Sequence, residues 1–162
     1  MKAQFFATIF TAAASASSAY AASFPNITTR STDCESSVKL FAISDEFGKT
    51  GITNYHEGAG INYLFLTGSD SPVYTYNSCS SQIYVPFEEN YKQFFNANSK
   101  GGIVQLTVGG PGGKIDVNED EYLTLDGDAH GWVACKNTGD PYNYSRDLYQ
   151  LAYGNTTFVG CK

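Results

Sequence analysis

The stretch "EYLTLDGDAHGWVACKN", residues 121–137, is compatible with two kinds of molecule. Asp126, Asp128 and His130 fall within five positions, just before the only tryptophan, Trp132, and could bind a metal through carboxylate oxygens and imidazole. However, aspartate and glycine favour turns for local reasons, and the residues before and after "LDGDAHG" have the pattern of strands. We therefore interpret the stretch as a strand, a polar turn and a second strand that ends in a disulfide. No metal site, cofactor or catalytic residue is expected in it.

The rest of the chain repeats this pattern of short apolar runs separated by Gly, Asn, Asp and Ser. Strict alternation, as in "IVQLTV" (103–108), has the period of two that a half-buried strand requires. Many short strands with regular turns predict an all-β fold, here a single antiparallel β-sandwich or barrel over residues 34–162. The expected strands are "VKLFAIS", "NYLFL", "PVYTY", "QIYVPF", "GIVQLTV", "GKIDV", "EYLTL", "GWVAC" and "LYQLAY".

One segment, "PFEENYKQFFNANSK" at residues 86–100, is a candidate helix, because Phe87, Tyr91, Phe94 and Phe95 would fall near one side of it. A long loop over a hydrophobic edge is the alternative for the same residues.

The N-terminus has the pattern of a secretory signal peptide. Lys2 is followed by an uncharged run, and Ala19-Tyr20-Ala21 places small residues where a signal peptidase cleaves, so we expect residues 1–21 to be removed. Residues 22–33 form a polar leader. No later stretch resembles a transmembrane segment, and the C-terminal "TTFVGCK" lacks the hydrophobic tail of a GPI signal.

Four cysteines that enter an oxidising compartment predict two disulfides. Three connectivities are open, and the sequence alone does not choose between them. We expect Cys34–Cys79 in the N-terminal half and Cys135–Cys161 in the C-terminal half. A zinc site is the alternative, but the spacing of Cys and His does not match known zinc motifs.

Charge and sequons add the remaining expectations. The net charge of −6 argues against nucleic acid and against anionic lipid as partners. Asn26, Asn143 and Asn155 each begin an N-glycosylation sequon, which in a secreted chain predicts an exposed loop or turn.

Sequence motifs of hydrolases are absent: neither a G-x-S-x-G elbow nor an H-E-x-x-H pair occurs, and "DVNEDEY" fails as a calcium loop, having Glu121 where glycine is needed. The chain is rich in tyrosine, and exposed aromatic rings can contact sugars and peptides. Candidate ligand-contact aromatics are Trp132, Tyr142 and Tyr144, although most aromatic residues are expected to pack within the sheets.

The segments "CESSVKLFAIS", "YNSCSSQIYV", "LTLDGDAHGWVACKN" and the terminal "TFVGCK" resemble small secreted cell-wall proteins of fungi. That group includes phialide-associated, IgE-binding and GPI-anchored yeast wall proteins. The resemblance is one of layout over most of the mature chain, and it brings no catalytic residues with it. It implies a non-enzymatic, wall-associated or extracellular protein with wall polysaccharide or glycoprotein as its expected partner. A carbohydrate- or host-ligand-binding module and a small secreted hydrolase are the alternatives.

Overall fold

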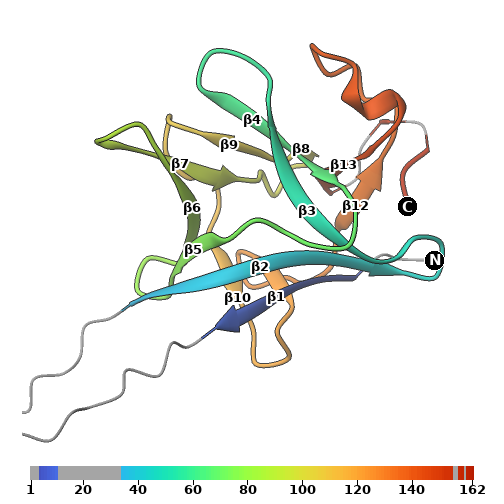
Figure 1. Ribbon diagram of the computed structural model, residues 1–162. Coiled ribbons are helices and arrows are strands. Elements are labelled where there is room, and N and C mark those ends of the chain that lie inside the picture. Colours follow the sequence, from blue (N-terminus) through green and yellow to red (C-terminus); the bar gives the residue numbers. More distant parts are fainter. Residues whose placement is uncertain (1–3, 11–33, 155–156, 159) are drawn as a thin grey trace, which may run out of the picture.

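The computed structural model describes residues 4–10, 34–154, 157–158 and 160–162. It confirms the expected all-β fold with antiparallel pairing (Figure 1). The elements are β1 (Gln4–Phe10), β2 (Glu35–Ser44), β3 (Gly48–His56), β4 (Ile61–Leu66), β5 (Tyr74–Asn77), β6 (Gln82–Phe87), β7 (Tyr91–Asn96), β8 (Gly102–Ile103), β9 (Gln105–Thr107), β10 (Ile115–Val117), β11 (Leu123–Leu125), β12 (Trp132–Cys135), the short 3-10 helix η1 (Tyr144–Arg146) and β13 (Tyr149–Tyr153).

The strands form a sandwich that closes like a barrel, because β2 and β4 belong to both of its walls. One wall has the order β1-β2-β3-β4-β13-β12. The other is β5-β6-β7-β9, which pairs at one edge with the start of β2 and at the other edge with the start of β4. A separate hairpin, β10–β11, covers one end (Figure 1).

The core follows from the two-residue period of the strands. In β2, Val38, Leu40 and Ala42 are fully buried, and in β4 the last three residues are buried. Side chains from both walls meet in a single apolar cluster that also includes Tyr74, and the hydroxyl of Tyr74 donates to the Ile52 carbonyl oxygen at 2.9 Å. The buried hydroxyl is thus satisfied, as burial of a polar group requires.

The expected disulfides are both formed. Cys34–Cys79 joins the start of β2 to the turn after β5, and Cys135–Cys161 joins the end of β12 to the C-terminal segment. Lys162 pairs with Ala134 through two backbone hydrogen bonds of 3.0 and 2.9 Å, so the chain end lies beside β12.

Residues 86–100 form neither the candidate helix nor the alternative long loop, because most of them belong to the β6–β7 hairpin. Phe87 ends β6 and pairs with Tyr91 at the start of β7, and the turn between them begins at Glu88, whose φ is 53°. Within β7, Gln93 and Phe95 are buried while their neighbours are more exposed, which is a strand period. Pairing across the sheet has therefore overridden a run of residues that also fits a helix.

The first strand lies inside the expected signal peptide. Residues 4–10 pair along their whole length with β2, from Gln4 opposite Ile43 to Phe10 opposite Ser37. Residues 11–33, which include the expected cleavage position, the polar leader and Asn26, lie outside the described residues. Among the residues that are described, none belongs to a helix with the length and apolar character needed to span a membrane.

Candidate functional site

Residues 121–137 contain two strands, β11 and β12, and the turn between them. The two strands belong to different sheets, since β11 pairs with β10 and β12 with β13. The turn between them is closed by reciprocal backbone hydrogen bonds of Leu125 and Asp128, and Asp126, Asp128 and His130 are exposed. Within the described ranges, no three His, Cys, Asp or Glu side chains gather at a spacing that could hold a metal.

Trp132 is a core residue. Its side chain is 3% exposed, and its indole N–H donates to the carbonyl oxygen of Leu123 at 2.9 Å. The ring packs edge-on against Tyr153 and Phe95, with centroids 4.8 and 6.1 Å away. With β1 in place, the interpretation of Trp132 as a ligand contact conflicts with its position, because a buried indole with a satisfied N–H offers nothing to a ligand at the surface.

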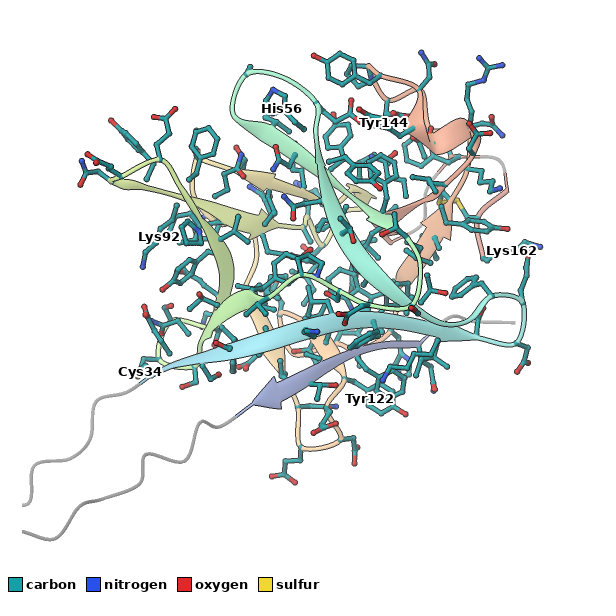
Figure 2. All side chains as sticks on the ribbon, viewed as in Figure 1. Cys34, His56, Lys92, Tyr122, Tyr144 and Lys162 are labelled. Atoms are coloured by element: carbon teal, nitrogen blue, oxygen red, sulfur yellow. A yellow bond between two sulfur atoms is a disulfide. The ribbon has the colours of Figure 1, made fainter. Side chains whose placement is uncertain are left out.

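The other two candidate aromatics, Tyr142 and Tyr144, lie together at the surface. They flank Asn143 at the start of η1 and are 55% and 39% exposed. Their ring centroids are 6.1 Å apart, and the Tyr144 ring lies 5.1 Å from that of Tyr55 on β3. We call these three residues the tyrosine platform; Figure 2 shows Tyr144 at the same end of the molecule as His56.

The platform is supported from below by the sheet. Phe65 of β4 is fully buried and packs edge-on against Tyr144, with the centroids 5.8 Å apart. Tyr55 also contacts Phe65, at 5.6 Å. Tyr55 and Phe65 lie on the paired strands β3 and β4, so two rings held by the sheet support the ring of Tyr144.

Two buried carboxylates hold the loop that carries the platform. Asp140, 5% exposed, accepts hydrogen bonds from the backbone N–H groups of Tyr144 (2.7 Å) and Ser145 (3.0 Å) and from the Ser145 hydroxyl. Glu57, 8% exposed, accepts from the backbone N–H of Tyr142 at 3.1 Å. Each platform tyrosine of this loop is therefore anchored through its backbone, which leaves its ring free to face outward.

The two carboxylates have opposite pKa shifts. Burial raises the pKa of Glu57 above its ordinary value, and the neighbouring charge of Asp140 raises it further, although the Tyr142 N–H acts the other way. Burial also opposes ionisation of Asp140, but the hydrogen bonds from Ser145 and Tyr144 outweigh it and leave the pKa of Asp140 lowered. Of the two carboxyl groups, Glu57 is therefore the one that keeps its proton to the higher pH.

These shifts predict opposite pH dependences for two variants. Unfolded Glu57 has a pKa near 4.5, and because its folded pKa is higher, the wild type loses stability as pH rises from 4.5 through the folded pKa. Glu57→Gln keeps an oxygen for the Tyr142 N–H and removes that loss. Its melting temperature relative to wild type should therefore rise between pH 4 and pH 7 in calorimetry.

Asp140→Asn is the matched control for this pH dependence. The lowered pKa of Asp140 stabilises the fold above its ordinary value of 3.8, so Asp140→Asn should cost about 1–3 kcal/mol at pH 7. That cost should shrink as the pH falls below 3.8. Parallel pH profiles for wild type and both variants would contradict the opposite pKa shifts of Glu57 and Asp140.

A catalytic use of this pair is disfavoured by its burial. Glycoside hydrolysis needs two carboxyl groups that both reach the substrate, and Glu57 and Asp140 are each at least 92% covered. Three of their four oxygens already accept hydrogen bonds from the loop. Through these hydrogen bonds the two carboxylates hold the loop that carries Tyr142 and Tyr144.

A polar cleft lies elsewhere, between the β5–β6 turn, the end of β7 and the start of β10. It has a volume of about 480 Å³ and is lined by hydroxyl and amide side chains together with Lys114 and Asp126. The lining contains no aromatic ring, so the cleft lacks the stacking surface that sugar rings prefer. Of Asp126, Asp128 and His130, Asp126 is the one that lines this cleft.

Only part of this site had a signal in the sequence. Tyr142 and Tyr144 lie on either side of Asn143, the first residue of a sequon, and Asn143 is exposed as a sequon residue should be. Asp140 precedes Pro141, which is a typical turn start, and could have been noticed as a capping side chain. Glu57 and Tyr55 had no local signal, because they meet the loop only through the fold. Asn155 lies outside the described residues.

Comparisons with known proteins relate the chain to one family and to fungal proteins. Residues 26–161 match the model of a family described as a domain of unknown function, DUF7907. Cell wall protein PGA31 of Candida albicans is 34% identical over 132 residues, which are 77% of this chain and 44% of that protein. Two further cell wall proteins of the same organism, PGA30 and RHD3, are each 32% identical, over 70% and 75% of this chain.

The chain spans 42% of PGA30 and 60% of RHD3, so these relatives are considerably longer than the region they share with it. No solved structure matches the chain. The family match includes all four cysteines, both platform tyrosines of the η1 loop and the two carboxylates beneath them. The chain therefore belongs to the DUF7907 family.

Proposed function

We propose that this protein is secreted, is associated with the fungal cell wall and acts there by binding rather than by catalysis. The names of its relatives, cell wall proteins of Candida albicans, support the location. The two disulfides support an oxidising, extracellular environment. The burial of the Glu57–Asp140 pair supports a role without catalysis.

The tyrosine platform is the observation that carries the binding role. Two neighbouring tyrosines, 55% and 39% exposed, are fixed by a buried phenylalanine and by backbone anchors. Rigid, exposed aromatic rings provide contact area at little entropic cost, and their hydroxyl groups remain available for hydrogen bonds. The apolar faces of a pyranose chain match such a surface, so we propose wall polysaccharide as the ligand.

Charge narrows the class of polysaccharide. The chain has a net charge of −6, and Asp140, whose lowered pKa favours the ionised form, lies under the platform. A negatively charged polymer would be repelled, whereas a neutral glucan or chitin would not. We therefore propose a neutral wall polysaccharide.

Alanine variants of the platform test this proposal. Each ring should contribute about 0.5–1.5 kcal/mol to binding, so Tyr142→Ala and Tyr144→Ala should each weaken sedimentation with insoluble β-glucan or chitin by roughly two- to tenfold. Tyr91→Ala is the matched control, because Tyr91 is 62% exposed but lies on the β6–β7 hairpin, away from the platform (Figure 1). Equal binding by all four proteins would contradict the proposal.

The sequon at Asn143 provides a second test of the same surface. Asn143 is exposed and lies between the two platform tyrosines, so a glycan attached there would lie beside the ligand. We propose N-glycosylation at this residue, and at Asn26 and Asn155, on the basis of the sequons. Removing this glycan by Asn143→Gln should therefore change the affinity for polysaccharide, as sedimentation with the insoluble polymer would measure.

A further inference from the structure

The strand β1 fills a slot in the wall of the fold rather than lying on its outside. On one side it pairs with Ser37–Ile43 of β2 over seven residues. On the other side the Ala7 N–H donates to the Glu121 carbonyl oxygen at 2.9 Å, and Phe6 forms a bridge with Tyr122. We call the space between these two segments the β1 slot; Figure 1 shows β1 beside β2, and Figure 2 shows Tyr122 on the same side.

Side chains of β1 also complete the core beneath the slot. Phe5 is 2% exposed and Ala7 is fully buried. The Phe5 ring lies 6.2 Å from Trp132, and the Phe6 ring lies 4.5 Å from Tyr122. The slot thus accommodates an extended segment whose inward side chains, two positions apart, are an aromatic residue and a small residue, as Phe5 and Ala7 are.

The strand that fills the slot belongs to the segment whose removal we expect. Residues 4–10 lie within the signal peptide pattern of residues 1–21, and the family match begins only at residue 26. The family match therefore includes every other strand of the structure but not β1. Its loss leaves Ser37–Ile43 of β2 without a partner on that side and uncovers an apolar floor at Trp132.

We infer that the mature protein binds an extended, uncharged segment of another polypeptide in the β1 slot, antiparallel to β2. Addition of a strand to a free sheet edge takes its affinity from backbone hydrogen bonds and its specificity from pockets for alternate side chains. The edge of β2 supplies the backbone hydrogen bonds, and the apolar floor at Trp132 supplies a pocket for an inward side chain. The inference rests on cleavage of residues 1–21 and is independent of the platform.

Two other occupants fit the slot less well. A second copy could pair its own β2 with this edge, but the inward residues of β2, Val38, Leu40 and Ala42, are already fully buried in their own core. Such a dimer would place no side chain where the Phe5 ring lies. The leader of the same chain, "ASFPNITTRSTD", has no alternation of apolar residues, and Pro25 lacks an N–H to donate.

The test uses the secreted chain that begins at residue 22 and an acetylated, amidated peptide of residues 4–10 with a lysine tail for solubility. Trp132 is the only tryptophan, so its emission reports on the floor of the slot directly. The peptide should shift that emission to the blue with saturation and should slow hydrogen exchange at the amides of Ser37–Ile43. A Phe5→Asp peptide should bind at least tenfold more weakly, and a Gln4→Asp peptide, changed at an exposed position, should bind nearly as well.

Three results would overturn the inference. The first is an unchanged Trp132 emission with β2 amides already protected in the chain alone, which would mean that the slot closes when β1 is lost. The second is a dimer by light scattering that the peptide does not dissociate. The third is failure of the chain from residue 22 to fold, because β1 would then be a permanent part of the protein.

Discussion

Replacing Trp132 by alanine should lower the free energy of unfolding by about 3–5 kcal/mol. The side chain is 3% exposed and contacts aromatic rings on β7 and β13, so its removal leaves a cavity that rigid strands cannot close. Guanidinium unfolding followed by circular dichroism measures the effect, since the variant has no tryptophan fluorescence.

Trp132→Phe separates packing from hydrogen bonding at this position. It keeps an aromatic ring but removes the donor to the Leu123 carbonyl, which is itself buried, and should cost about 1–3 kcal/mol. Tyr142→Ala is the surface control and should change stability by less than about 0.5 kcal/mol. A loss below about 1 kcal/mol for Trp132→Ala would contradict the core position of this ring.

Removing the Cys135–Cys161 disulfide should be almost as costly. The bond closes a loop of 26 residues, and the loop-entropy model gives about 3–4 kcal/mol for a loop of that size. The double variant Cys135→Ala, Cys161→Ala should therefore lower the midpoint of guanidinium unfolding. The other disulfide, Cys34–Cys79, should remain formed. Free-thiol titration before and after unfolding checks that Cys34–Cys79 remains intact.

The same variant should release the chain end from β12. Lys162 is held by two backbone hydrogen bonds to Ala134 and by an ion pair with Glu46 at 3.1 Å, and this pair is exposed at both partners. Exposed ion pairs contribute little, so the disulfide is the main constraint on this segment. Faster hydrogen exchange at Ala134, with no change in β5, is the expected pattern. Equal protection at Ala134 in both proteins would contradict it.

The fold class could be predicted because most strands carry their own signal. Alternation in "IVQLTV" and the turn in "LDGDAHG" are local patterns, and the structure has strands and a turn there. The strand β3 was not expected, because "GKTGITNYH" is polar and contains two glycines. Gly51 is required by a distant residue: a Cβ there would lie 2.0 Å from the Asp70 carbonyl oxygen. Such a constraint cannot be read from nearby residues.

Only some residues of the candidate site could be predicted from the sequence, for the same reason. Tyr142 and Tyr144 lie on either side of Asn143 in a polar segment, so both could be named in advance as candidate surface aromatics. Trp132 could not be distinguished from them by residue type, and its burial depends on rings from β7 and β13. Glu57 reaches the η1 loop from the end of β3, and no spacing in the sequence joins the two.

We propose that the protein resides in the fungal wall and is held there by the tyrosine platform. The most direct measurement is fractionation of producing cells into medium, a detergent-and-reductant wash of the wall, and wall released by glucanase, with detection of this chain in each. We predict that the wild type is found mainly in the two wall fractions and that the Tyr142→Ala, Tyr144→Ala double variant shifts to the medium. Recovery of the wild type almost entirely from the medium would contradict the claim.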